Sequence, residues 1–127
     1  MVGFILVGVG SFLGGILRYG LSTWVHRVLD NPWFPYGTLA VNTLGCLFIG
    51  FIAGLVETRV ALTSEVRLFL LVGILGGFTT FSSFALETFS LARDTENIAA
   101  LMNIGAQVMV GLLCVWIGNA LAHTIGG

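Results

Sequence analysis

The run GGFTTFSSF, at residues 76–84, combines residue types that rarely occur together in an apolar segment. Its two adjacent glycines weaken a helix, and a helix break there would free carbonyls that suit a small hard cation such as Na⁺. Its four hydroxyl residues could cap the two half-helices or donate to an anion. In an unbroken helix, the same hydroxyls would instead bond back to carbonyls four residues earlier.

A second polar pair lies in another apolar run, where Thr38 and Asn42 are four residues apart and therefore share a helix face. Asn42 could join two helices by a hydrogen bond or donate its N–H groups to a passing anion. The phenylalanines of GGFTTFSSF recur every third residue, which is also usual for core or lipid-facing positions. Because a phenyl ring has a positive edge, these rings together with the amide and hydroxyl donors indicate an anion path.

Other chemistries find little support in the sequence. The charge-free runs contain no acid or histidine, and Glu87 follows Ser83 by four residues, where we expect it to face water near a span end. Cys46 and Cys114 lie in apolar runs and are interpreted as free thiols. A net charge of −1 does not favour nucleic-acid binding. We therefore predict neither an enzyme nor a nucleic-acid-binding protein.

The composition defines the elements that must position these residues. The chain is 57% hydrophobic and 9% charged, whereas soluble domains are about 25% charged. A membrane span needs about 20 apolar residues, and no segment has the pattern of a strand. The sequence thus predicts an all-α membrane protein with one four-helix transmembrane domain, its spans covering residues 2–28, 37–56, 68–92 and 98–122.

The basic residues are balanced across the four expected spans. Arg59 and Arg67 fall on one side of the membrane, and Arg27 and Arg93 fall on the other, together with Arg18 if it extends outward. The positive-inside rule therefore assigns no orientation. Either one determinant escapes detection, or the chain inserts both ways and pairs with its inverted copy. Since four helices enclose little lumen, a conduction path is expected between subunits.

Four sequence blocks carry a resemblance to the Fluc (CrcB) family of fluoride channels. GGFTTFSSF matches the family pattern GG-x-TTFS-x-F, and GGILRYG, GTLAVNTLGCLFIG and VWIGNAL support it in the other spans. The resemblance implies a channel for passive fluoride export that lowers cytoplasmic fluoride. It also implies a multi-pass protein of the cell membrane that forms an antiparallel, dual-topology homodimer, with two pores at the interface and the third helix broken at mid-membrane.

The resemblance assigns roles to individual residues. A structural sodium ion shared by both subunits would be bound by the backbone carbonyls of Gly76 and Thr79. The residues implied for the fluoride pathway are Asn42, Phe81, Phe84, Thr38, Thr80 and Ser83. Less closely matched positions are Arg18, Glu87 and, where some relatives have Tyr and Ser on the fourth helix, Asn103 and Gln107.

Two other functions remain as alternatives. A proton-coupled exporter of the small multidrug type also has four spans and can insert both ways. Such exporters use a glutamate in the first helix, and residues 2–29 contain no Asp or Glu. The third possibility is a non-conducting helical subunit of a larger complex, which would carry no ion flux by itself.

Overall fold

The structure, a computed structural model, describes residues 1–58 and 62–126 and is helical in every regular element of those ranges. Three helices are long: α1 (Val2–Val28), α2 (Tyr36–Glu57) and α6 (Asn97–Gly126). The third expected span is divided into segments. These are α3 (Ser64–Arg67), the π-helix η1 (Leu68–Leu75), α4 (Gly76–Phe78) and α5 (Phe81–Arg93).

Four helical stretches are long and apolar enough to cross a membrane, which confirms the all-helical prediction with four spans. They are Val2–Val28, Tyr36–Glu57, Ser64–Arg93 and Asn97–Gly126. They extend beyond the expected ranges at several ends. The reason is that capped polar turns, such as the one that begins at Ser64 after the N-cap Thr63, continue the apolar helices into polar sequence.

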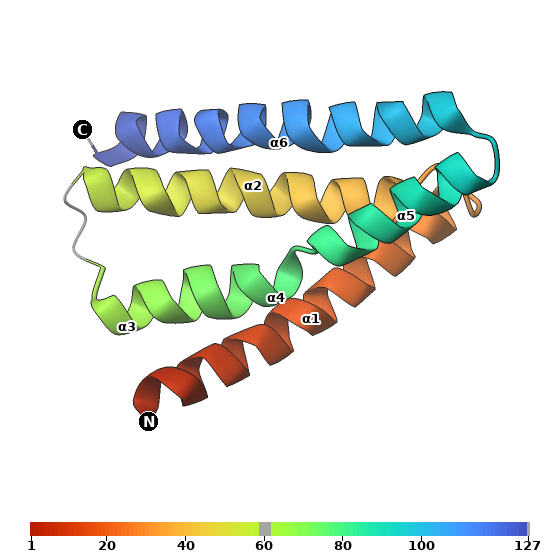
Figure 1. The fold of residues 1–127 in the computed structure, drawn as a ribbon. Coiled ribbons are helices and arrows are strands. Elements are labelled where there is room, and N and C mark those ends of the chain that lie inside the picture. The colour runs from red at the N-terminus through yellow and green to blue at the C-terminus, as the bar shows by residue number, and fades with distance from the viewer. Residues whose placement is uncertain (59–61, 127) are drawn as a thin grey trace.

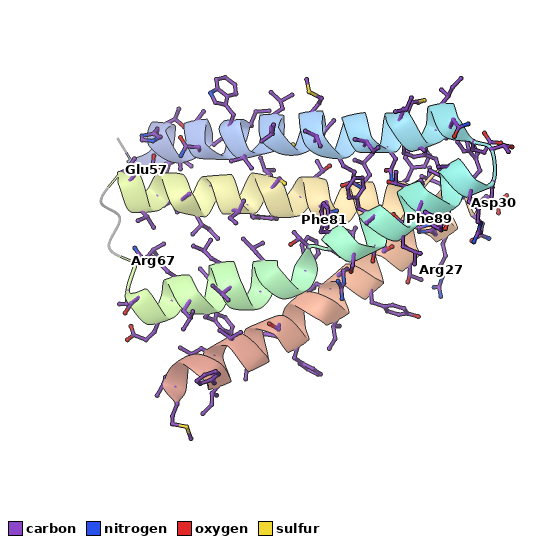
Figure 2. All side chains as sticks on the ribbon, viewed as in Figure 1. Arg27, Asp30, Glu57, Arg67, Phe81 and Phe89 are labelled. Atoms are coloured by element: carbon purple, nitrogen blue, oxygen red, sulfur yellow. The ribbon has the colours of Figure 1, made fainter. Side chains whose placement is uncertain are left out.

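Most charged side chains lie at or near the ends of the helices, whereas Arg18 and Glu87 lie within them. Figure 2 shows Glu57 and Arg67 at one end of the bundle and Arg27 and Asp30 at the other. Arg59, which the sequence analysis places beside Arg67, lies outside the described residues. The arrangement is that of a bundle whose length matches the thickness of a bilayer.

Helices α2 and α6 run side by side along most of their length (Figure 1). Glycines allow the two backbones to touch. A Cβ added at Gly50 would lie 2.8 Å from the Val115 Cα, and one added at Gly118 would lie 2.7 Å from the Phe51 amide nitrogen. Neither position has room for a side chain, so small residues determine how closely these helices pack.

Helix α1 crosses the segmented third span at the level of η1 and α4 (Figure 1). A Cβ at Gly14 would collide with the Ile74 carbonyl, and a Cβ at Gly77 would lie 2.7 Å from the Ser11 Cα. The Ser11 hydroxyl also donates to the Gly73 carbonyl at 3.4 Å. These backbone contacts hold the segment before the helix interruption firmly against α1.

The interruption itself lies at two threonines. Thr79 (ψ 157°) and Thr80 (ψ 114°) are extended, so α4 ends at Phe78 and α5 begins at Phe81. The sequence allows either a break at the adjacent glycines Gly76 and Gly77 or an unbroken helix, and in the structure both glycines are helical. Gly77 packs against the backbone of α1 and stays helical in that contact. The interruption falls instead at Thr80, because its extended backbone finds hydrogen-bond partners on α2.

The glycine contact between α1 and α4 can be tested by one added methyl group. Gly14→Ala should lower the free energy of unfolding by roughly 1–3 kcal/mol, because the methyl group overlaps a backbone carbonyl that cannot move freely. The measurement is thermal unfolding in detergent. Gly8→Ala on the same helix is the matched control, since nothing lies within 4 Å of its Cβ position. Equal stability of the two variants would contradict the packing described here.

Candidate functional site

The side chain of Asn42 spans the helix interruption from the neighbouring helix α2. Its Oδ1 accepts a hydrogen bond from the Thr80 N–H at 2.8 Å, and its Nδ2 donates to the Thr80 carbonyl at 3.0 Å. The same Nδ2 donates to the Gln107 Oε1 on α6 at 3.0 Å. One amide side chain therefore replaces both backbone partners that Thr80 would have in a continuous helix.

The hydroxyl groups of the motif divide between two tasks. The Thr80 Oγ1 accepts the Ser83 N–H at 3.2 Å as the N-cap of α5, and it donates to the Ser83 Oγ at 3.0 Å. The Thr79 Oγ1 bonds back to the Leu75 carbonyl at 2.9 Å. Both of the alternatives that the sequence leaves open, capping and back-bonding, are thus used by neighbouring residues.

Several carbonyls next to the interruption lose their helical partners, and those of Gly76 and Thr79 are among them. In a continuous helix the Gly76 carbonyl would accept from the Thr80 N–H, and the Thr79 carbonyl would accept from the Ser83 N–H. These N–H groups donate instead to the Asn42 Oδ1 and the Thr80 Oγ1. The affected carbonyls include those of the two residues that the family resemblance assigns to sodium, and carbonyl oxygen is a ligand type that hard cations accept.

Side-chain metal ligands are not gathered anywhere in the described part of the chain, where no group of three His, Cys, Asp or Glu could hold an ion. A cation at the interruption would therefore have to use oxygens of the backbone or of neutral side chains. Gly76 is exposed and Thr79 is half-buried in the single chain, so both are accessible to an ion or to another subunit.

A cavity of about 370 Å³ opens beside the interruption. Its polar lining comes from Asn42, Thr79, Thr80 and Gln107, and its remaining lining residues are Gly45, Cys46, Ile49, Leu71, Leu75, Gly76, Phe81, Phe84 and Val108. No charged residue lines it among the described residues. The lining of the cavity therefore combines amide, hydroxyl and phenyl groups without a fixed charge.

Phe81 and Phe84 form an edge-to-face pair at the start of α5, with ring centroids 5.4 Å apart and planes at 62°. Phe81 is 78% exposed, so its ring does not belong to the core of the single chain. Figure 2 shows Phe81 at the interruption and Phe89 further along the same helix. A ring in this position is available to whatever occupies the cavity or covers this face.

A second cavity, of about 510 Å³, lies on the other side of Thr80, which lines both. Arg18, Thr38, Ser83 and Glu87 are among its lining residues. Thr80 therefore connects the polar lining of the second cavity with that of the first. This brings together pathway positions from α1, α2 and α5 that lie far apart in the sequence.

Glu87 is more enclosed than the sequence led us to expect. It is half-buried, its Oε1 accepts a hydrogen bond from the Thr38 hydroxyl at 2.6 Å, and its Oε2 is buried without a partner among the described residues. This pair cannot be recognised in the sequence, since its members are separated by 49 positions. His26 also lines the second cavity.

The two α6 positions have different surroundings although they are one helical turn apart. Gln107 lines the first cavity and bonds to Asn42. Asn103 is fully buried, donates to the Thr88 Oγ1 at 2.9 Å, and lines neither of the two cavities described here. The structure therefore brings Gln107 to the site and leaves Asn103 between α5 and α6.

Comparison with known proteins assigns this chain to a family. The family model described as CrcB-like protein, Camphor Resistance (CrcB), matches residues 5–119. The chain belongs to the CrcB family. The four helices of this CrcB chain are thus those of a multi-pass membrane protein, and the resemblance seen in the sequence motifs is confirmed.

Several relatives cover nearly the whole of the CrcB chain. A protein of Paramagnetospirillum magneticum is 45% identical, covering 98% of each chain, and one of Chloroflexus aurantiacus is 42% identical, covering 95% of each. Both are named fluoride-specific ion channel FluC. A protein of Methanosarcina acetivorans, named fluoride-specific ion channel FluC 1, is 40% identical over 93% of this chain and 88% of its own.

The cap at the interruption gives a test that does not depend on transport. Thr80→Val keeps the shape of the side chain but removes the hydroxyl that caps α5, so it should destabilise the CrcB chain by about 1 kcal/mol. Thr124→Val removes a hydroxyl that bonds only to a nearby carbonyl near the exposed end of α6 and should have a smaller effect. Thermal unfolding compares the two, and a Thr80 variant as stable as the Thr124 variant would contradict the capping role.

Proposed function

We propose that this chain is a fluoride-specific channel that exports fluoride passively and so lowers cytoplasmic fluoride. The observation that carries the proposal is the uncharged lining of the cavity beside the helix interruption, where amide, hydroxyl and phenyl groups from three helices meet. Near-full-length relatives that bear the name of fluoride-specific channels support it. The function is transport of an ion and involves no enzymatic reaction.

Fluoride is small and holds its water tightly, so a path for it must replace that water with close hydrogen-bond donors. The proposed path runs over Thr38, Thr80 and Ser83 and then over Asn42, Phe81 and Phe84, with Arg18 drawing anions toward its entrance. A fixed positive charge in the narrow part would bind the anion too strongly to release it. Phenyl edges and neutral donors attract fluoride weakly enough for it to leave.

The working form in this proposal is an antiparallel homodimer of two identical four-span domains, inserted in both orientations. The single chain leaves Phe81 exposed and the cavity open on one face, so a second copy would complete the path. The helix interruption would then lie at mid-membrane. Balanced arginines on the two sides of the expected spans allow both orientations.

A structural sodium ion fits the backbone at the interruption. The carbonyls of Gly76 and Thr79 would hold it, together with the same carbonyls of the second subunit, since their helical partners donate elsewhere. When bound, the ion supplies a positive charge that ties the broken helices together. The chain's own contribution is to hold these carbonyls free, through Asn42 and the Thr80 hydroxyl.

One observation favours a second candidate, the proton-coupled exporter. Glu87 is a half-buried carboxylate inside a stretch long enough to span a membrane, and such groups carry protons in transporters. The exporter would use Glu87 in place of the missing first-helix glutamate. The position of Glu87 beside the Thr38 hydroxyl, rather than among groups that would contact an apolar substrate, agrees better with the channel.

Efflux from liposomes tests the channel directly. Vesicles that contain the purified protein and potassium fluoride should release fluoride passively, as followed with a fluoride electrode, while chloride-loaded vesicles leak far more slowly. Release that requires a proton gradient, together with binding of hydrophobic cations that disappears in Glu87→Gln, would favour the exporter. No flux of any kind would favour a non-conducting subunit.

The two rings at the interruption can be tested against a third ring on the same helix. Phe81→Ile or Phe84→Ile should slow fluoride efflux by about tenfold or more, because each removes a polarised ring edge from the cavity. Phe89→Ile is the matched control, since Phe89 is exposed on α5 away from the two cavities at the interruption. All three variants should elute as the same assembly in gel filtration.

Equal slowing by Phe89→Ile would show that any ring loss on α5 disturbs transport, and the assignment of the path would fail. A loss of assembly in the Phe81 or Phe84 variants alone would instead assign those rings to packing.

A further inference from the structure

His26 lies where the last turns of α1 approach α2 and α5. A Cβ added at Gly37 of α2 would lie 2.5 Å from the His26 Cε1, so the imidazole ring packs directly on the backbone of α2. The half-buried His26 lines the second cavity and also a further cavity of about 390 Å³ beside the loop between α1 and α2. Glu87 of α5 lines both cavities as well. The ring is therefore part of the wall at the charged end of the proposed path.

A hydrogen bond determines which nitrogen of the ring carries the proton. The His26 Nδ1 lies 2.7 Å from the Ser22 carbonyl oxygen. Because a carbonyl can only accept, Nδ1 is the protonated nitrogen of the neutral ring. The other nitrogen, Nε2, has no hydrogen-bond partner among the described residues and is not one of their fully buried atoms. A second proton can therefore bind at Nε2, and make the ring a cation, without breaking the bond to Ser22.

The groups around the second cavity make the charge of His26 decisive. Arg18 of α1 and Glu87 of α5 both line this cavity, and their opposite formal charges cancel. Tyr19 also lines it, and a phenol is ordinarily uncharged near neutral pH. The side chain that α2 directs to this wall from beside Gly37 is Thr38, which does not titrate.

The further cavity adds no net charge on the other side of the ring. Besides Glu87, its lining contains Asp94 at the end of α5. The Asp94 Oδ1 lies 3.1 Å from the Arg93 Nε, and both side chains are largely exposed to water. The groups that surround His26 thus have a net formal charge of zero when the ring is neutral and of one positive unit when it is protonated.

We propose that protonation of His26 makes the second cavity attract anions, so that fluoride enters the path faster in acidic than in alkaline solution. The inference rests on the proposed function, since it names a residue that regulates the entrance of the fluoride path. A positive charge in a cleft raises the local concentration of anions and their rate of entry. Imidazole side chains ordinarily change charge near about pH 6.5. Because this charge lies at the entrance, the narrow part of the path stays neutral and can release the anion.

Fluoride efflux from vesicles at about pH 6 and about pH 8, on either side of the usual imidazole range, measures the effect. With the same pH inside and outside, the unmodified protein should release fluoride about threefold to tenfold faster at the lower pH, a modest part of the enhancement that charge in a cleft can give. The leak from protein-free vesicles at each pH is subtracted. An added inert salt should reduce the difference, because it screens the charge.

His26→Asn keeps an N–H group near the position of Nδ1 and removes the titration. Its efflux should be equal at the two pH values and match that of the unmodified protein at the higher pH. His26→Arg supplies a permanent cation and should release fluoride rapidly at both. His123→Asn is the matched control, since His123 is the only other histidine of the chain and bonds to Glu57 at the opposite end of the bundle (Figure 2). This variant should keep the full difference between the two pH values.

A second readout does not need transport. Fluoride should raise the unfolding temperature of the unmodified protein more at the lower pH than at the higher, because an anion held beside a cation stabilises the folded state. His26→Asn should remove that difference, and His123→Asn should keep it.

Specific outcomes would overturn the inference. They are equal efflux of the unmodified protein at the two pH values, a pH difference that His26→Asn retains, or one that high salt leaves unchanged. If the protein carries no fluoride but shows the pH-dependent shift that His26→Asn removes, the proposed function fails and the attraction of anions by His26 stands. If it shows neither efflux nor such a shift, both fail.

Discussion

Unpaired backbone groups are the constraint on which this structure depends. In an apolar medium every N–H and carbonyl needs a partner, so a transmembrane helix can be interrupted only where other groups replace the lost bonds. Here the replacement comes from one amide and one hydroxyl. Asn42 pairs with both backbone groups of Thr80, and the Thr80 Oγ1 caps the helix that follows. The cavity beside the interruption and the carbonyls left without helical partners there accompany these few bonds.

Glycine contacts between helices hold this local arrangement in place within the bundle. Because Gly14 and Gly77 bring α1 against α4, the residues before the interruption cannot rotate away from it. Because Gly50 and Gly118 bring α2 against α6, the side chains of the two helices interleave, and Asn42 reaches the α6 residue that completes its bonds. A helix pair packed through larger residues would be further apart, and a side chain as short as that of asparagine could not bridge three segments.

The chemistry of the site is neutral at its centre and charged only at one side. Amide, hydroxyl and phenyl groups surround the first cavity, whereas Arg18 and Glu87 line the second. Such a gradation suits an anion that must be attracted, stripped of water and then released, since a donor without net charge binds it less strongly than a cation would. The same neutrality explains why the sequence contains no recognisable catalytic set, and it agrees with the proposal of a conducting rather than a reacting site.

By itself the sequence determined the four apolar helices, the membrane setting and the family, because hydropathy and the GGFTTFSSF motif are local properties of the chain. It also identified the residues that gather at the interruption. The tertiary structure alone decided that the break falls at Thr79 and Thr80, that Glu87 pairs with Thr38, and that Gln107 but not Asn103 lines the cavity. These outcomes depend on contacts between helices far apart in the chain, and helical periodicity can assign residues to a common face without specifying which neighbour that face will meet.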